Sequence, residues 1–127
     1  MNAPLIISPV GTVHQTTGAL AQAIDMPTQR GLRIVVKVSA VSGTSPTLTL
    51  KLQTYDGASG TFVDVKGAST LALDATGTTE MTIYPGISSV VNEAVNAHPG
   101  RLCQLYATIG GSATPKVTAS IGVDRLA

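Results

Sequence analysis

The nucleophilic and metal-binding side chains of this 127-residue chain are few and far apart in the sequence. Histidine occurs twice, as His14 and His98, and cysteine once, as Cys103. A zinc site needs three or four ligands that are usually clustered, and these residues lack such a spacing. A Cys–His nucleophile would need an exposed thiol in a positive environment. Cys103 instead alternates with Leu105 in a strand pattern, so we expect it to be a small buried side chain.

The carboxylates are also isolated from one another along the chain. Acid–base catalysis with paired carboxyl groups needs two of them to converge in a cleft. Asp56 and Asp74 fit better as turn residues whose side chains accept hydrogen bonds from their own backbone. The segment around Asp56 has too few oxygen ligands for a calcium loop. We therefore expect no catalytic residue, no metal site, no cofactor and no enzymatic activity. The other carboxylates considered lie singly in turns or on outward faces: Asp64, Glu80, Glu93 and Asp124.

Sequence features for binding phosphate, nucleic acid or sugar are weak. The glycine-rich stretches at 57–60 and 110–111 do not open helices, as a phosphate-binding loop requires. The chain has eight Lys and Arg residues and seven Asp and Glu residues, with no run of either sign. This balanced, scattered charge argues against a nucleic-acid or membrane partner. A sugar-stacking face of Tyr55, Tyr84 and Tyr106 is an alternative. A core or interface role is favoured for these tyrosines, since the chain has no Trp.

The composition is typical of a β-sheet protein. Val, Ile and Thr together number 38, and β-branched side chains suit the pleated surface of a sheet. Charged residues make up 12% of the chain, about half of the usual 25%. We expect a single domain at this length, because about two-thirds of the unfolded surface can be buried. One cysteine excludes an intrachain disulfide, which suits synthesis in a reducing cytosol.

The N-terminal residues 1–11 are expected to lie at the edge of a single domain formed by residues 12–127. The apolar run Leu5, Ile6 and Ile7 is too short for a secretory signal or a membrane span. Two interpretations remain open for this segment. It is either an arm that contacts a partner through these three side chains, or a first edge strand in the sheet of its own domain.

Alternating apolar and polar residues predict about eight short strands, separated by turn signals every 8–12 residues. This pattern favours an all-β fold, either a sandwich or a barrel. We expect an antiparallel β-sandwich, of which the jelly-roll is one form. The segment 87–97 fits either a short helix or an irregular strand. The side chains expected to point inward are Leu32, Ile34, Val36, Val38, Leu48, Leu50, Leu52, Met81, Ile83, Cys103, Leu105, Ala107, Ile109, Val117, Ala119, Ile121 and Val123.

Two segments share one pattern, a small polar turn with proline followed by a strict alternation. They are SGTSPTLTLKL, residues 42–52, and GGSATPKVTASIG, residues 110–122. Pro46 and Pro115 lack an amide N–H and push the preceding residue towards an extended conformation. We therefore expect each segment to close a hairpin. The expected strand pairs are 31–41 with 47–54, and 101–109 with 116–124.

The run from 42 to 65, SGTSPTLTLKLQTYDGASGTFVDV, resembles a segment common in small structural proteins of tailed bacteriophages. The shared pattern is a GTSPTL turn and strand, a Gln, an Asp-Gly hairpin, and an aromatic residue followed by Asp-Val. Related proteins often carry Trp where this chain has Phe. The stretches YPG and TPKVTASIG are similar to the same proteins. The matching positions are Gly43 to Leu48, Gln53, Asp56-Gly57, Phe62, Asp64-Val65, Tyr84 to Gly86 and Thr114 to Gly122.

The family that the chain resembles is that of minor capsid or decoration (cement) proteins, which are β-sandwich or jelly-roll modules. The resemblance implies a virion protein, synthesised in the host cytoplasm, that binds the exterior of the assembled major capsid protein lattice and stabilises it. Such proteins are commonly homotrimers. Few charges guard the expected strand edges, which agrees with a working state as an assembly. Two alternatives remain: a tail or baseplate structural module, or a free carbohydrate-binding β-sandwich.

Overall fold

The computed structural model describes residues 4–20 and 23–127, which form strands and no helix. The all-β prediction is thus confirmed. The described residues form nine strands in one sheet instead of about eight short ones, and two of the strands are 26 and 25 residues long. Segment 87–97, which fitted a helix or a strand, contains a two-residue strand. The strands are β1 (Leu5–Ser8), β2 (Val13–His14), β3 (Gly18–Ala19), β4 (Ile24–Asp25), β5 (Gly31–Asp56), β6 (Thr61–Ser69), β7 (Gly77–Ile83), β8 (Ala94–Val95) and β9 (Leu102–Leu126).

Two long strands, β5 and β9, organise the sheet. They pair antiparallel along nearly their whole length, from Gly31 opposite Leu126 to Thr54 opposite Cys103. The predicted hairpins are therefore wrong, because each segment is one continuous strand and the two strands are partners of each other. The prolines are tolerated because they fall where the register shifts and the ladder is interrupted, so the missing N–H costs no ladder hydrogen bond.

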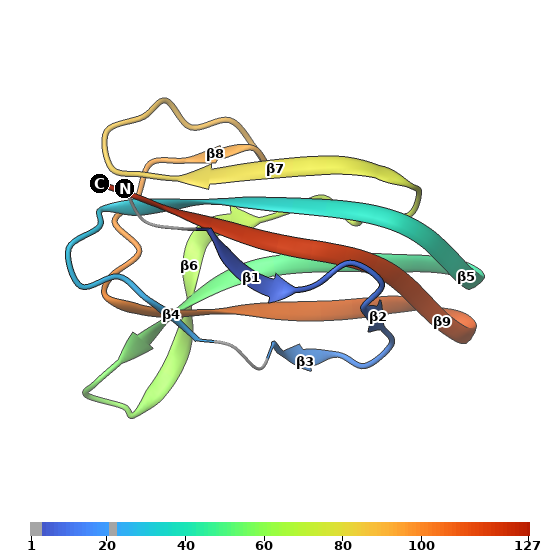
Figure 1. The fold of residues 1–127 in the computed structure, drawn as a ribbon. Helices are drawn as coiled ribbons and strands as arrows, with labels where there is room; N and C mark the ends of the chain where they lie inside the picture. The colour runs from blue at the N-terminus through green and yellow to red at the C-terminus, as the bar shows by residue number, and fades with distance from the viewer. Residues whose placement is uncertain (1–3, 21–22) are drawn as a thin grey trace.

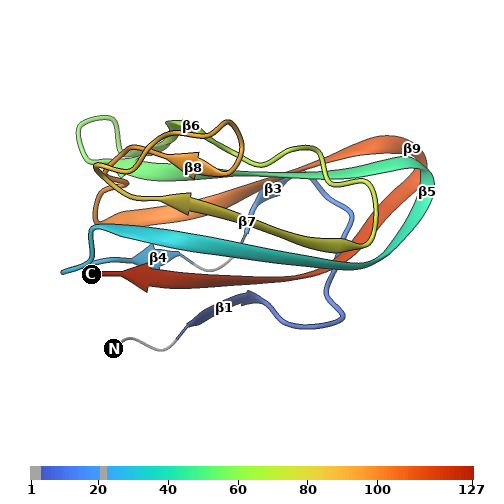
Figure 2. The ribbon, with the colours of Figure 1, turned by 90° about the horizontal axis from the view of Figure 1, so that it is seen from above.

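Both long strands bend at the same level, residues 42–47 and 110–116, at the right of Figure 2. The bend folds the sheet over on itself, so that its two parts face each other (Figures 1 and 2). Several residues at this bend have backbone torsions in the left-handed region. Glycine adopts this conformation at little cost, and other residues adopt it with strain. These torsions occur at Gly43 (φ 101°), Ser45 (49°), Gly111 (111°), Ala113 (57°) and Thr114 (56°).

The bend divides the sheet into two halves. In the first half the order is β1-β9-β5-β7-β8, with β7 and β8 parallel and the other pairs antiparallel. In the second half, β6 pairs with the later part of β5, and β3 and β4 pair with the early part of β9. The side chains expected to point inward lie between the halves and are buried, except that Ile109 is partly buried. The predicted core is therefore confirmed.

Strand β1 forms an edge of the first half. Leu5 lies opposite Val123 and Ile6 opposite Gly122. Of the two interpretations of the N-terminal segment, the structure shows the edge strand for its described part; residues 1–3 lie outside the described residues. Leu5 and Ile7 pack against the core of their own domain, whereas Ile6 is exposed. Of these three side chains, that of Ile6 is therefore the one available to a partner.

Candidate functional site

The structure does not bring the histidines, the cysteine and the carboxylates into one site. Within residues 4–20 and 23–127, no three side chains of His, Cys, Asp or Glu lie close enough together to hold a metal ion. His14 is buried in β2, where Nε2 lies 3.3 Å from the carbonyl oxygen of Ala119. His98 is exposed, and its Nδ1 accepts a hydrogen bond from the N–H of Gly100 (3.2 Å).

Burial of His14 makes the stability of the fold sensitive to acid. Desolvation lowers the pKa of His14 below 6.5, although the hydrogen bond to Ala119 partly opposes this. Because the unfolded chain then takes up a proton at higher pH than the folded chain, the free energy of unfolding is expected to fall as pH drops below 6.5. Urea unfolding from pH 7 to 5 measures this slope. His14→Gln should flatten it, whereas the exposed His98→Gln should not; equal slopes in both variants would contradict the expectation.

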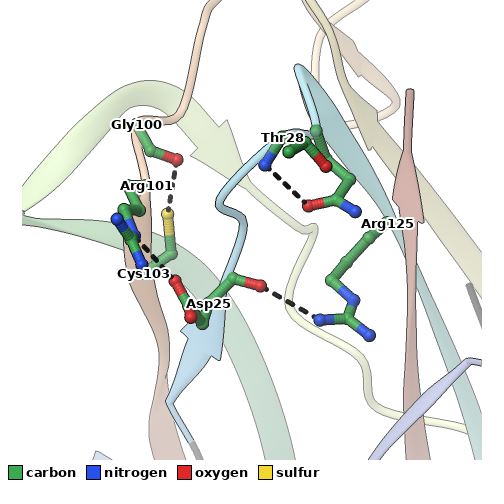
Figure 3. A network of polar contacts seen from close by, with 7 residues as sticks. Asp25, Thr28, Gly100, Arg101, Cys103 and Arg125 are labelled. Carbon is green, nitrogen blue, oxygen red and sulfur yellow. Dashed lines mark hydrogen bonds and ion pairs between the residues drawn. The ribbon is translucent and has the colours of Figure 1, made fainter.

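Cys103 is a core side chain, as its alternation with Leu105 predicts. Its thiol faces the carbonyl oxygens of Pro99 (3.2 Å) and Gly100 (3.9 Å), and Figure 3 shows the second contact. Burial raises the pKa of Cys103 to about 11. A thiol that is both buried and protonated at neutral pH is a poor nucleophile.

The native protein is therefore expected not to react with a thiol-specific disulfide dye at neutral pH. The rate of dye release measures the fraction of exposed thiolate. Adding denaturant should release one equivalent of dye per chain, since Cys103 is the single cysteine, and Cys103→Ala provides the blank. Rapid labelling of the folded protein would contradict the burial of this side chain.

The carboxylates make local contacts on the surface. Asp56 is a turn residue as predicted: its Oδ1 accepts a hydrogen bond from the N–H of Ala58 (3.1 Å). Hydrogen bonds from Ser59 and Ala58 lower the pKa of Asp56. Asp74 lies exposed before β7, without such a bond among the described residues. Exposed ion pairs, such as that of Asp124 with Arg33 (2.8 Å), contribute little to stability.

Asp25 joins the two halves of the sheet at the end opposite the bend. Its Oδ1 accepts a hydrogen bond from Nε of Arg101 (3.2 Å), just before β9, and its backbone carbonyl accepts one from Nη1 of Arg125 (3.1 Å), near the end of β9 (Figure 3). A hollow of about 670 Å³ lies beside Arg125, lined in part by Arg33 and Asp124. These last two residues pair with each other, whereas Nε of Arg125 is buried and has no hydrogen-bond partner among the described residues.

Three of the four aromatic residues of the chain lie on the outer face of the second half. Tyr55 in β5 lies opposite Phe62 in β6, and their rings meet edge to face with centroids 5.4 Å apart. Tyr106 in β9 lies opposite Lys51 in β5, whose Nζ is 4.9 Å from the centre of the Tyr106 ring. The third tyrosine, Tyr84, lies elsewhere and donates a hydrogen bond to the carbonyl oxygen of Ala127 (2.6 Å).

A row of hydrogen-bonded polar side chains connects these aromatic residues. Gln104 Nε2 donates to Gln53 Oε1 (2.7 Å), and Gln53 Nε2 donates to Asp64 Oδ1 (3.0 Å). Lys51 Nζ lies 3.1 Å from the same carboxylate oxygen. The hydrogen bonds from Gln53 and Lys51 lower the pKa of Asp64. We call this surface the aromatic face; it consists of Lys51, Gln53, Tyr55, Phe62, Asp64, Gln104 and Tyr106.

The aromatic face has the chemistry of a recognition surface. Its side chains hold one another in place, so a partner would not have to order each of them separately. Tyrosine is enriched at protein interfaces because a large apolar ring carries a polar group at its tip. Sequence reasoning named two of these tyrosines but did not assemble the face, because the register of β5 with β6 and β9 decides which residues become neighbours.

Searches of known proteins found no matching family model, no matching curated protein and no matching solved structure. In the described part of the chain, no helix is long and apolar enough to cross a membrane.

Proposed function

We propose that this chain is a virion structural protein of a tailed bacteriophage, a capsid decoration protein that binds the outer surface of the assembled major capsid protein lattice and stabilises it. The observation that carries the proposal is the aromatic face. Three aromatic side chains and a pre-ordered polar row on one exposed sheet face have the composition of a protein interface. The resemblance of residues 42–65 supplies the class of partner.

Four of the residues that carry the resemblance lie on or beside this face. Gln53, Phe62 and Asp64 belong to the aromatic face itself, and Asp56 begins the turn that joins β5 to β6. Gln53 points away from the core because Leu50 and Leu52 of the same strand are buried, and Asp64 lies opposite Gln53, as Phe62 lies opposite the exposed Tyr55. Packing of the core therefore does not account for the residue types at Gln53, Phe62 and Asp64, whereas contact with a partner would.

Binding to purified shells tests the proposal. The purified chain is expected to sediment with expanded, DNA-free capsids until the sites are saturated, and not to bind unassembled capsid subunits. Tyrosine side chains at the centre of an interface often contribute about 2 kcal/mol or more. Tyr55→Ala and Tyr106→Ala should therefore each weaken shell binding about thirtyfold. Tyr84→Phe is the control, because Tyr84 lies away from the face.

Two results would contradict the decoration role. One is the absence of saturable binding to any expanded shell. The other is mass spectrometry of purified heads and tails that finds the chain in tails alone, which would favour the tail or baseplate module. The same experiment on intact particles thus decides between head and tail.

The aromatic face also favours a second candidate, carbohydrate binding. Aromatic rings beside amide and carboxylate groups are suited to stack on sugars and to hydrogen-bond their hydroxyls. In that case the native chain would be retarded in gels that contain a bound polysaccharide, and Tyr55→Ala would remove the retardation. The native chain would not bind shells. Shell binding without retardation would exclude this candidate.

A further inference from the structure

Strand β7 has an open edge on the side away from β5. It pairs with β5 along its whole length, from Gly77 to Ile83, with no shift in register. On its other side, β8 pairs only with Thr82 and Ile83, at the end of β7 (Figure 1). In the described part of the chain, no strand pairs with the earlier residues of β7 on that side. These residues therefore form an edge of the first half of the sheet.

The contact with β8 shows which backbone groups face this edge. The N–H of Thr82 donates to the carbonyl oxygen of Glu93 (2.9 Å), just before β8. Backbone groups of successive residues in a strand point to opposite sides, so those of Thr78 and Glu80 point to the same edge as those of Thr82. Among the described residues, these groups of Thr78 and Glu80 have no hydrogen-bond partner. They are therefore free to bind another chain.

The edge of β7 is regular, unlike the edges of β1 and β6. The pairing of β1 with β9 has a shift in register, and Pro9 follows β1 directly. The pairing of β6 with β5 also has a shift. Bulges and prolines interrupt the row of backbone groups that an added strand would need. Neither occurs in β7, so a further strand can form hydrogen bonds with Thr78 and Glu80.

Two exposed apolar side chains flank the open edge. Leu71 is 65% exposed and Val91 is 86% exposed. Together with Thr78 and Glu80 they line a hollow of about 280 Å³. A second hollow of about 330 Å³ shares Leu71 and Thr78 with the first, so the space follows β7. A strand added here would bring its own side chains against Leu71 and Val91 and remove apolar surface from water.

The charged residues that line these hollows are acidic. Glu80 and Glu93 line the first hollow and Asp74 lines the second, and among the described residues no Lys or Arg lines either one. Within the same part of the chain, neither Glu93 nor Asp74 takes part in an ion pair. Lys or Arg side chains on an added strand would therefore be complementary to the site.

The cations of neighbouring elements lie outside these hollows. Arg33 pairs with Asp124 (2.8 Å) as well as with Glu80 (3.4 Å), and the side chain of Glu80 is still 57% exposed. Lys37 is a residue of β5, on the other side of β7 from the open edge. Lys66 lines a separate hollow beside β8. The carboxylates at the open edge therefore remain available to a partner.

We infer that the open edge of β7 binds an extended basic segment of a partner polypeptide, which adds a strand beside Thr78 and Glu80. In this mode of binding, main-chain hydrogen bonds provide affinity and the side chains of alternate residues provide specificity. The site lies on the first half of the sheet, whereas the aromatic face lies on the second half. The inference therefore goes beyond the proposed function and does not depend on it.

Hydrogen exchange followed by NMR tests the inference. In the free chain, the amides of Thr78 and Glu80 should exchange at least about tenfold faster than those of Thr79 and Met81, which face β5. The probe is a short capped peptide in which valine alternates with arginine. A saturating amount of the probe should slow exchange at Thr78 and Glu80 at least about tenfold and leave Thr79 and Met81 unchanged.

Two matched peptides show what the edge recognises. A peptide with glutamate in place of every arginine should bind at least about tenfold more weakly, because like charges then meet at the edge. The basic peptide with every internal amide N-methylated keeps its charge but loses its backbone donors. It should not slow the exchange of Thr78 or Glu80, since it cannot complete the hydrogen bonds of an added strand.

Variants of the protein locate the charges that the basic probe contacts. Glu80→Gln and Glu93→Gln should each weaken binding of the probe about threefold, as expected for exposed ion pairs. Asp124→Asn is the matched control, because Asp124 also pairs with Arg33 but lies on β9, which β5 separates from β7. This control should bind the probe like the native chain.

A second pair of variants tests the apolar contacts. Leu71→Ser and Val91→Ser in one chain should weaken binding about tenfold, because both side chains would otherwise be covered by the added strand. Both positions are so exposed that folding should be unaffected. Val63→Ser is the control, since Val63 is 43% exposed on β6, away from the open edge of β7.

Three results would overturn the inference. One is equally slow exchange of Thr78, Thr79, Glu80 and Met81 in the free chain, which would mean that the edge is already covered. Another is a basic probe that protects neither Thr78 nor Glu80, or that binds no better than the acidic peptide. The third is protection that appears without the probe as the protein concentration rises, which would assign the edge to a second copy of the chain. Shell sedimentation tests the aromatic face separately, so failure of the decoration role can be told apart from failure of the strand-binding edge.

Discussion

The Gly31→Ala protein is expected to lose more than about 3 kcal/mol of its free energy of unfolding. A Cβ atom at Gly31 would overlap the carbonyl oxygen of Ile83 and lie 2.7 Å from Cδ2 of Tyr84. Gly31 begins β5 and Ile83 ends β7, at the point where these two strands pair. The obstructing oxygen belongs to the backbone and cannot rotate away, so the two strands would have to separate locally.

Urea unfolding at neutral pH measures this loss. Gly18→Ala is the matched control, because Gly18 also begins a strand but has no heavy atom within 4 Å of the position that a Cβ atom would take. The control should change stability by less than about 1 kcal/mol. Equal stability of the two variants would contradict the close approach of β5 to the end of β7.

Gly111→Ala is expected to destabilise the fold by about 2–5 kcal/mol. A Cβ atom there would lie 2.7 Å from the carbonyl oxygen of Ser45 and 2.8 Å from that of Thr44, where the bends of β5 and β9 cross. Overpacking of this kind costs about 1–3 kcal/mol. The φ of 111° at Gly111 adds strain of about 1–2 kcal/mol for any residue with a Cβ.

A second glycine separates the two causes. Gly86 has a φ of 92° and no heavy atom within 4 Å of a Cβ position, so Gly86→Ala carries the backbone strain without the overlap. Thermal and urea unfolding of both variants should show that Gly111→Ala is the less stable by at least about 1 kcal/mol. If the two losses were equal, the bends would not be in contact, and the two halves of the sheet would not be joined as described.

Local alternation determined which segments are extended and which of their side chains face inward. In a strand, successive side chains point to opposite sides, so the pattern of Leu48, Leu50 and Leu52 predicts one buried face without knowledge of the partner. The same reasoning placed Cys103 in the core, and turn chemistry placed Asp56. These features depend on residues within a few positions of one another, which is why the sequence alone predicts them.

The partners of the strands were decided by tertiary structure. A turn with proline and glycine can close a hairpin or bend a continuous strand, and the choice at Pro46 and Pro115 depends on the distant strand that each segment meets. The aromatic face arises in the same way, because the register of β5 against both neighbours brings Tyr55, Phe62 and Tyr106 to one surface. Pairing between strands that lie far apart in the chain is non-local, so alternation within a segment carries no information about it.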